Sequence, residues 1–295
     1  MILVLRALGI GDLATGVPAL RALRRAFPER TLVLAAPAWL GPLVDLVGGI
    51  DAVVPCDGLE PRALPQASWA VNLHGKGPQS HRLLRRSRPA RLRAFACPEA
   101  EHVDGPEWND GEHEVRRWCR LLEWYGVPTD PTDLRLRAPS RPVREGAAVV
   151  HPGAKAASRR WPPRRFAAVA RQLAARGYEV VVTGSAAERP IAECVAALAD
   201  LPDDAVLAGR TDPAELAGVV ARARLVVSGD TGVAHLATAY RIPSVVMFGP
   251  VTPDLWGPPP DRSEHRALWR GPTVASIGVE EVLAAVDEVT CAAAA

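Results

Sequence analysis

The stretch Val226-Val227-Ser228-Gly229-Asp230-Thr231-Gly232-Val233-Ala234-His235 joins an apolar run to a turn-rich loop and then to a segment of helical character. Residues 225–227 predict a buried strand, and residues 235–239 predict a helix. Backbone N–H groups at a helix N-terminus point outward, and the helix dipole there favours negative charge. The sequence therefore predicts an anion-binding loop between a strand and a helix.

The start of the chain repeats this pattern in the other half of the sequence. Residues 2–5 predict a strand, and Gly9-Ile10-Gly11 predicts a tight turn. Asp12 is the expected cap of a helix that begins near Leu13 and covers residues 14–26. Two strand–loop–helix sites in separate halves of the chain predict two halves that face a common cleft.

The composition is that of an ordinary globular protein. The chain has 295 residues, 48% hydrophobic and 23% charged, which predicts two domains. A formal net charge of +2 gives no general reason to expect a nucleic-acid partner. Five cysteines without a C-x-x-C pair favour neither a disulfide framework nor a zinc knuckle, so we expect no metal site. No apolar run approaches the roughly 20 residues that span a bilayer. No signal peptide is recognised either, so we expect a cytoplasmic protein.

Predicted strands and helices alternate through both halves, which predicts an α/β fold of two Rossmann-like, doubly wound domains with parallel sheets. The proline-rich residues 128–142 are the expected linker and hinge. We expect one domain over residues 1–138, a second over residues 139–278, and a terminal helix within residues 279–295 that can pack back on the first domain. The other expected strands are residues 31–35, 52–54, 67–73, 147–150, 179–183, 205–207 and 244–248. The other expected helices are residues 39–47, 112–125, 164–176, 188–198, 213–221 and 279–289.

Six segments, taken in order, resemble glycosyltransferase family 9, the heptosyltransferase-like enzymes of GT-B fold. They are LRALGIGDLATGVPALRALRRAFP, LHG, HPGAKAASRRWPPRRFAAVA, VVVTGS, GRTDPAELAGVVARARLVVSGDTGVAHLATAYRIPSVVMFGP and VEEVLAAV. The resemblance implies a nucleoside-diphosphate sugar donor, with ADP-heptose favoured, and inverting transfer to an acceptor hydroxyl. It implies no cofactor and no obligatory metal, which agrees with the absence of a D-x-D triplet.

Asp12 has two interpretations. As a helix cap it would contribute ~1 kcal/mol to stability. As a general base it would take the proton of the acceptor hydroxyl, an effect of about 10²–10⁴-fold in rate. In the family the aspartate after the glycine turn is the proposed base, so the resemblance favours catalysis.

The donor diphosphate requires positive charge, and Arg159 and Arg160 are candidates to supply it. Lys155 can assist from the same loop, which also contains Gly153. The family usually has a lysine two residues before the tryptophan; Arg159 keeps its charge and adds a bidentate fork. The alternative is a solvated loop face, and Trp161 is the expected packing anchor of the next helix.

The remaining donor candidates follow strands of the second half. Thr231 and the N–H of Gly232 can bind the diphosphate, and the resemblance assigns Asp230 to the donor sugar hydroxyls, with helix capping as its alternative. His235 either touches the donor phosphate or packs. By resemblance, the nucleotide pocket is lined by Gly184, Ser185, Gly209, Arg210 and Thr211.

The acceptor candidates are in the first half. Gly9 and Gly11 of the opening turn, together with His74, Gly75 and Lys76, are expected to meet a glycan, glycolipid or small-molecule acceptor. The alternative is that His74 has a structural role. Residues 82–93 hold six arginines. They are either a solvated face or a patch for phosphate-bearing acceptors or anionic lipid headgroups, which would place the protein peripherally at the inner face of the cytoplasmic membrane.

Two rival functions stay open. One is a sugar-nucleotide epimerase or hydrolase of the same fold, which would turn over without an acceptor. The other is a non-catalytic nucleotide-binding protein, because function belongs to the site and not to the fold.

Overall fold

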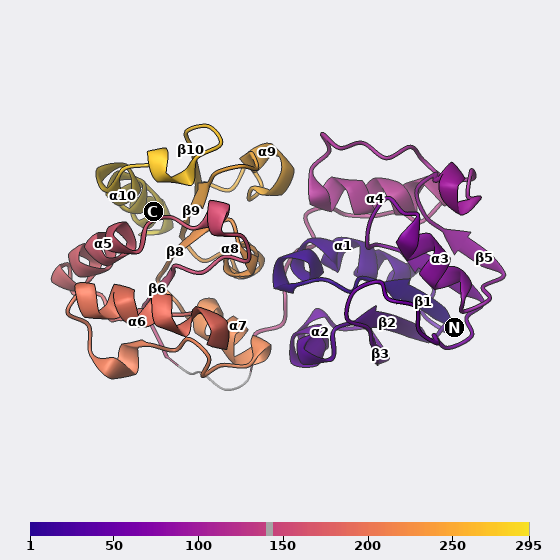
Figure 1. The fold of residues 1–295 in the computed structure, drawn as a ribbon, viewed down its shortest axis with the longest axis horizontal. Coiled ribbons are helices and arrows are strands. Elements are labelled where there is room, and N and C mark those ends of the chain that lie inside the picture. The colour runs from indigo at the N-terminus through magenta and orange to yellow at the C-terminus, as the bar shows by residue number, and fades with distance from the viewer. Residues whose placement is uncertain (140–143, 295) are drawn as a thin grey trace. The chain divides into compact units, whose positions relative to one another are not determined.

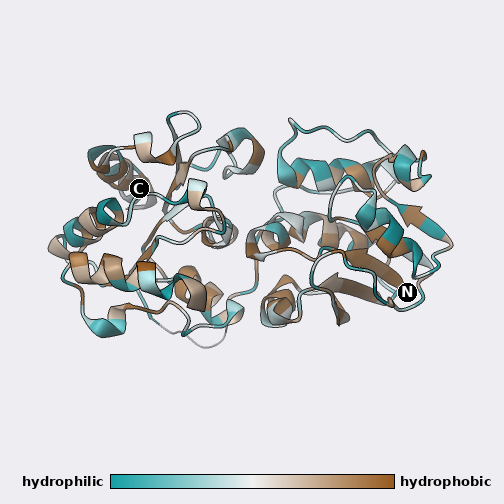
Figure 2. Ribbon diagram, in the orientation of Figure 1, coloured by the Kyte–Doolittle hydropathy of each residue, from teal (hydrophilic) through white to brown (hydrophobic). Residues whose placement is uncertain are grey.

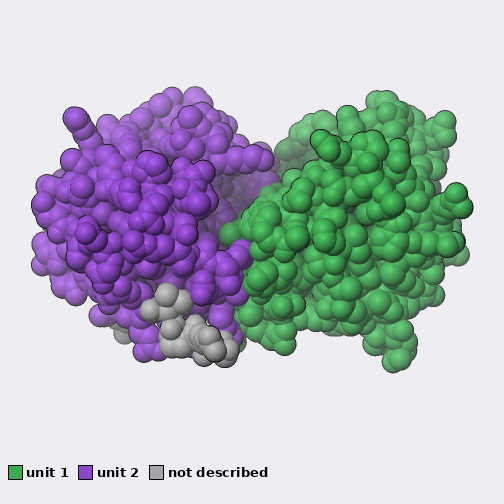
Figure 3. Space-filling model, turned by 60° about the horizontal axis from the view of Figure 1, so that its bottom comes forward, with its two compact units in different colours: residues 1–137 green, residues 138–295 purple. Residues whose placement is uncertain are grey.

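The computed structural model describes residues 1–139 and 144–294. The chain divides into two compact units, Met1–Arg137 and Ala138–Ala295 (Figure 1, Figure 3). Of the expected linker, residues 140–142 lie outside the described residues.

Unit 1 is built on a parallel sheet with strand order β3-β2-β1-β4-β5. Most of its strand residues are apolar on both faces, as expected for a sheet covered by helices (Figure 2). The strands are β1 (Ile2–Leu5), β2 (Leu32–Ala36), β3 (Ala52–Pro55), β4 (Trp69–Asn72) and β5 (Arg91–Arg93). The helices are α1 (Ile10–Ala26), α2 (Gly41–Val47), α3 (Gln79–Arg85) and α4 (Glu114–Trp124), with short 3₁₀ turns at Ala38–Leu40 and Pro98–Ala100.

Unit 2 has its own parallel sheet, with strand order β10-β9-β8-β6-β7. The strands are β6 (Ala148–His151), β7 (Val180–Val182), β8 (Leu225–Gly229), β9 (Ser244–Phe248) and β10 (His265–Trp269). The helices are α5 (Pro163–Ala175), α6 (Arg189–Leu198), α7 (Pro213–Ala221), α8 (Gly232–Tyr240), α9 (Pro253–Trp256) and α10 (Val279–Ala294). Short 3₁₀ turns lie at Ala157–Arg159, Ala186–Glu188, Asp203–Ala205 and Val274–Ser276. Each unit is thus an open, doubly wound α/β sheet, which confirms the predicted fold class.

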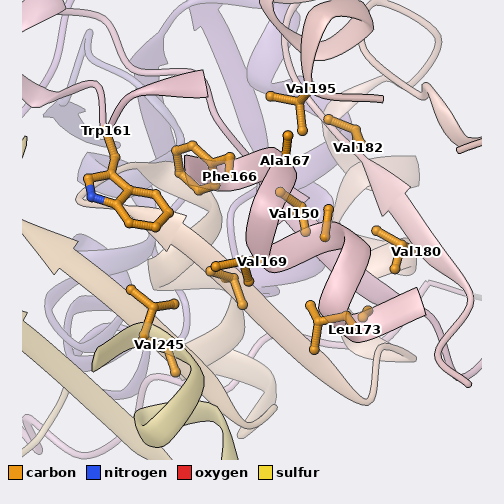
Figure 4. Packing of buried hydrophobic residues seen from close by; sticks show 14 of the residues in the cluster. Val150, Trp161, Phe166, Ala167, Val169, Leu173, Val180, Val182, Val195 and Val245 are labelled. Atoms are coloured by element: carbon orange, nitrogen blue, oxygen red, sulfur yellow. The ribbon is translucent and has the colours of Figure 1, made fainter. Parts of the chain in front are cut away.

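The core of unit 2 fixes the loop that follows β6. Trp161 is completely buried and meets Phe166 edge-on, with 5.0 Å between ring centres (Figure 4). Its Nε1 donates a hydrogen bond to the carbonyl of Ile277 at 3.0 Å. Trp161 is therefore a packing anchor, as predicted. It holds the loop 151–160 against the start of α5.

Helix α10 packs within unit 2. Its side chains Val282, Val286 and Val289 are buried in the core of unit 2, and the helix contacts α5, β9 and β10. An amphipathic helix has one apolar face, and the apolar face of α10 is buried in the core of unit 2.

Several predicted boundaries are corrected. Helix α1 begins at Ile10 rather than near Leu13, and the expected strand over residues 205–207 is only a single bridge between Val182 and Val206. The elements α3, β5, α9 and β10 were not expected. None of the helices among the described residues is both long and apolar enough to cross a bilayer.

Candidate functional site

The loop between β1 and α1 places Asp12 inside the first helical turn, not at the cap. Gly9 is the capping residue, and its N–H donates to Oδ2 of Asp12 at 3.1 Å. An acidic residue at the third helical position commonly satisfies the amide of the capping residue in this way. Asp12, Gly9 and Gly11 are only partly buried. Asp12 is therefore held at the carboxyl edge of the sheet by one oxygen.

The buried side chain of Arg6 holds this loop in place through hydrogen bonds. The sequence analysis did not single out this residue. Its side chain is almost fully buried and donates to the backbone carbonyls of Asp12 and Leu73. A third nitrogen donates to Oγ1 of Thr15 at 3.0 Å and to Oε1 of Glu114 at 3.1 Å. Arg6 thus ties the first turn of α1, the end of β4 and the start of α4 together. The sequence feature that could have revealed this buried arginine is its position inside the otherwise apolar run Leu3–Leu8.

The second part of this buried network is on α4. Glu114 also accepts from Nε1 of Trp118 at 2.8 Å and pairs with Arg117. The Arg6 guanidinium lies 4.9 Å from the centre of the Trp118 ring. The buried carboxylate and both guanidinium groups are therefore paired, as buried charges must be.

His74 lies beside the same loop. Its Nδ1 accepts from the N–H of Ala7 at 3.2 Å, which leaves the proton of the neutral ring on Nε2. Burial lowers the pKa of His74 to about 4, and the charge of Arg6 adds to this while Asp12 opposes it. His74 is therefore neutral at pH 7 and close enough to Asp12 to sense its charge.

The rest of this loop is set by Asn72. Its amide donates to the carbonyl of Gly75 at 3.0 Å, and its Oδ1 accepts from the N–H of His74 at 3.0 Å. Lys76 is exposed and lies 3.8 Å from Asp110. The structure thus brings Gly9, Gly11, Asp12 and His74 to one edge of unit 1 and directs Lys76 to an exposed carboxylate.

In unit 2, the N-terminus of α8 has the features of an anion site. Thr231 is its capping residue but forms no side-chain cap, and the buried Oγ1 of Thr231 has no hydrogen-bond partner among the described residues. Arg159 lies at this helix end, with its NH1 3.3 Å from Oδ2 of the buried Asp230. Asp230 is also tied to β9, because its N–H donates to the carbonyl of Met247 at 3.1 Å. Its negative charge is compensated, and the Arg159 side chain stays 39% exposed.

The neighbouring residues of these two loops have different surroundings. Arg160 donates to the carbonyl of Ala154 at 2.9 Å and therefore turns back onto its own loop. Lys155 is exposed. The ring of His235 packs edge-on against Trp256, with 5.8 Å between centres. The structure thus joins Arg159, and not Arg160, to Asp230.

Glu188 is a second residue that the sequence analysis did not single out. Its Oε2 accepts from both the N–H and the hydroxyl of Ser185, each at 2.8 Å. Burial raises its pKa, but the Ser185 bonds and the charges of His151 and Arg160 outweigh this and hold the pKa below its usual value. A half-buried, ionised carboxylate therefore lies where β7 ends.

Gly153 and Gly209 allow the loops around Glu188 to approach closely. A Cβ on Gly153 would lie 2.3 Å from the Glu188 carboxylate. Gly209 has φ +70° and donates its N–H to the carbonyl of Gly184 at 2.9 Å. The structure thus gathers the loops that contain Gly153, Gly184 and Gly209, with Arg210 exposed and Thr211 half-buried beside them.

The comparison with family models decides the identity. The model for glycosyltransferase family 9 (heptosyltransferase) matches residues 102–275, which is more than half of the chain. The chain belongs to this family. As a family 9 member it is a glycosyltransferase, so the non-catalytic alternative is set aside.

Known relatives and solved structures agree with this assignment. Lipopolysaccharide heptosyltransferase 2 of Escherichia coli K12 is 25% identical over 309 residues, covering 87% of this chain and 85% of that protein. Lipopolysaccharide heptosyltransferase 1 of Pseudomonas aeruginosa is 34% identical over 160 residues, covering 50% and 42%. The family 9 glycosyltransferase structure from Veillonella parvula has a TM-score of 0.81 at 18% identity and covers 99% of this chain and 97% of that one. The E. coli ADP-heptose lipopolysaccharide heptosyltransferase II structure has a TM-score of 0.79 at 19% identity, covering 100% and 99%. These likenesses confirm the GT-B fold.

Proposed function

We propose that this family 9 enzyme transfers a sugar, with heptose favoured, from a nucleoside diphosphate to a hydroxyl of a cell-envelope glycan or a small glycoside. ADP-heptose is the favoured donor. The relatives named above support this, since they are lipopolysaccharide heptosyltransferases. Similar folds have been solved with ADP and with ADP-2-deoxy-2-fluoro heptose. The use of a nucleotide sugar is the reason for proposing a cytoplasmic location.

The proposal rests above all on the uncapped N-terminus of α8 beside Arg159. The first-turn N–H groups, the Thr231 hydroxyl and the exposed part of Arg159 would bind the donor diphosphate. As the bond from the anomeric carbon to the phosphate oxygen breaks, negative charge grows on that oxygen. Fixed positive groups stabilise this charge. No metal or cofactor enters this scheme.

Asp230 would hold the donor sugar. Arg159 compensates its charge, so the carboxylate can stand beside a diphosphate without strong repulsion. Its oxygens accept hydrogen bonds from sugar hydroxyls. Asp230 would therefore orient the sugar while Arg159 receives the leaving group.

Glu188 would bind the nucleoside. An ionised carboxylate with one oxygen held by Ser185 can accept from two neighbouring ribose hydroxyls with the other. The loops with Gly184 and Gly209 lie next to it and would line the pocket of the base. The exposed Lys155 would assist with the phosphates, and the exposed Arg210 would line the nucleotide pocket.

Asp12 would act as the general base. It would take the proton of the acceptor hydroxyl as that oxygen bonds to the anomeric carbon, on the side opposite the leaving diphosphate. This displacement inverts the anomeric configuration. Neutral His74, with its proton on Nε2, would donate a hydrogen bond to the acceptor. Gly75 and Lys76 belong to the same acceptor-facing loop.

Fold alone does not separate a transferase from an epimerase. A structure described as a UDP-N-acetylglucosamine 2-epimerase from Listeria monocytogenes has a TM-score of 0.55 at 12% identity. The family match favours transfer. Turnover that requires an acceptor would separate the two reactions.

The test is calorimetric titration with ADP, UDP, GDP, CDP and dTDP. We expect ADP to bind, and Arg159→Ala to weaken its affinity about 10- to 100-fold, because a charge-assisted hydrogen bond contributes about 1.5–3 kcal/mol. Arg164→Ala is the matched control, since Arg164 is exposed five residues further along. Failure of all five nucleotides to bind, or equal affinity of both variants for ADP, would reject this donor site.

A further inference from the structure

The opposite edge of the unit 1 sheet carries a cluster of arginines. Because the strands are parallel, they all begin at this edge. The N–H of Ser68 donates to the carbonyl of Met1 at 3.1 Å, and the N–H of Arg91 donates to the carbonyl of Ser68 at 3.3 Å. The starts of β1, β4 and β5 are therefore adjacent, with the N-terminus and β5 on one side of unit 1 (Figure 1). Asp12 and His74 lie at the other end of these strands.

Two of these arginines are fixed on Trp69. The guanidinium groups of Arg30 and Arg93 lie 4.4 and 4.2 Å from the centre of its ring. Arg93 is 8% exposed, and its NH1 has no hydrogen-bond partner in the described part of the chain. The two cations are therefore held by an aromatic ring and not by carboxylates.

Three more arginines extend the cluster into solvent. Arg86, Arg88 and Arg91 are exposed, and in residues 1–139 and 144–294 none of their side chains forms an ion pair or a hydrogen bond. Arg24, by contrast, is paired with Asp51. We name Arg30, Arg86, Arg88, Arg91 and Arg93 the arginine edge.

An exposed tryptophan comes one residue before a tyrosine that contacts the arginine edge. Trp124, at the end of α4, is 60% exposed. It precedes Tyr125, whose ring centre is 5.7 Å from the Arg93 guanidinium. The carboxylates nearest in the chain are Glu29, beside Arg30, Glu99, six residues after Arg93, and Glu123, beside Trp124, which accepts from the hydroxyl of Thr129. Positive charge therefore dominates the edge, and an indole flanks it.

We propose that the arginine edge and Trp124 bind the anionic headgroups of a membrane surface. Arginine binds phosphate oxygens bidentately, and clustered basic residues are attracted to anionic lipid. Tryptophan partitions into the headgroup region. A single-stranded nucleic acid fits less well, because successive bases stack on several aromatic faces, and Arg30 and Arg93 cover Trp69, which leaves the indole of Trp124 for such stacking. Contact at this edge leaves the Asp12 end of the strands accessible. The proposal does not depend on the proposed donor or acceptor.

The test is co-sedimentation of the full chain with lipid vesicles. We expect binding to vesicles of phosphatidylcholine mixed with phosphatidylglycerol, weak binding to phosphatidylcholine alone, and a loss of binding as salt increases. Arg86→Gln with Arg91→Gln should lower the affinity about 25-fold, about fivefold for each arginine. The control pair Arg116→Gln with Arg135→Gln removes the same charge from exposed positions elsewhere in unit 1 and should leave the affinity unchanged.

Three further measurements test the proposal: binding by a Trp124 variant, the unfolding temperatures of all variants, and displacement from vesicles. Trp124→Ser should weaken binding without altering its salt dependence, since it removes an uncharged anchor. All variants should keep the unfolding temperature of the wild type, because the altered side chains are exposed. Absence of binding to anionic vesicles would overturn the proposal, and so would equal affinity of the two double variants. Displacement of the protein from vesicles by low concentrations of inorganic phosphate or of a single-stranded oligonucleotide would also overturn it.

Discussion

Replacing Arg6 with methionine should disrupt the Asp12 loop from its base. Methionine fills similar space but donates no hydrogen bond. The buried carbonyl of Leu73 would lose its side-chain donor, the carbonyl of Asp12 would keep only the Thr15 hydroxyl as a side-chain donor, and Glu114 would lose one of its two cations. The change therefore removes the connection between α1, β4 and α4.

The size of the effect follows from these contacts. The buried carbonyl of Leu73, left without this partner, costs about 1–3 kcal/mol, and the carbonyl of Asp12, which keeps the Thr15 hydroxyl, costs less. Glu114 keeps Arg117 and Trp118, so the charge term is smaller than the about 3–5 kcal/mol of a fully broken buried pair. We expect a loss of about 4 kcal/mol in the free energy of unfolding. This is a large share of the about 5–15 kcal/mol typical of a native protein.

Urea unfolding followed by tryptophan fluorescence measures this loss, because Trp118 lies against Arg6. Arg116→Met is the control. Arg116 is an exposed residue of α4, and surface changes of this kind stay within about 0.5 kcal/mol. Arg6→Lys should recover only part of the stability, because an ammonium group cannot hold four separated acceptors in a fixed arrangement. A loss below about 1 kcal/mol for Arg6→Met would refute this account of the network.

Two other changes test neighbouring parts of the site. Gly153→Ala should push the Glu188 carboxylate away from Ser185 and weaken ADP binding about tenfold in calorimetry. Gly278→Ala is the control, because Gly278 has open space around it, and it should not change the ADP affinity. Equal ADP affinities of the two variants would contradict the role of Glu188. Because burial holds the pKa of folded His74 at about 4, while an unfolded histidine titrates near 6.5, the unfolded state binds more protons between these values. Stability should therefore fall as the pH drops from about 6.5 to about 4, by at most about 3 kcal/mol from His74, and level off below. Urea midpoints of the wild type and of His74→Gln, measured at each pH, differ by the contribution of His74 to stability. A difference that does not change with pH would show that His74 is not buried as described.

The fold could be predicted wherever apolar runs alternate with amphipathic segments. β1, β6, β8 and β9 are continuous apolar strands of the kind that parallel sheets bury on both faces. By contrast, β5 reads Arg-Leu-Arg and was missed. Its place in the sheet depends on the ring of Trp69, which packs against Arg93 and is remote in sequence.

The candidate site could be predicted from loops at strand ends but not from side chains that act beneath them. The loops of Asp12 and Asp230 were predicted because glycine and aspartate follow an apolar run. Arg6 depends on its pairing with Glu114, more than a hundred residues further along the chain, which no local pattern reveals. Glu188 was passed over as part of a helix start, and its role depends on the close approach allowed by Gly153.

The start of α1 shows how a local rule can choose the wrong residue. Aspartate is a frequent capping residue, so Asp12 was expected at the cap. The same carboxylate also suits the third helical position, where it accepts from the amide of Gly9. The difference moves the helix start by one turn and fixes one Asp12 oxygen.

The most direct test of the central claim is the turnover of Asp12→Asn with ADP-heptose and a soluble lipopolysaccharide inner-core fragment. Asparagine can still accept from the amide of Gly9, so the helix start is preserved. We predict that the wild type transfers the sugar with inversion, and that Asp12→Asn lowers kcat about 10²–10⁴-fold while ADP affinity stays unchanged. Wild-type turnover by Asp12→Asn would contradict the assignment of Asp12 as the base.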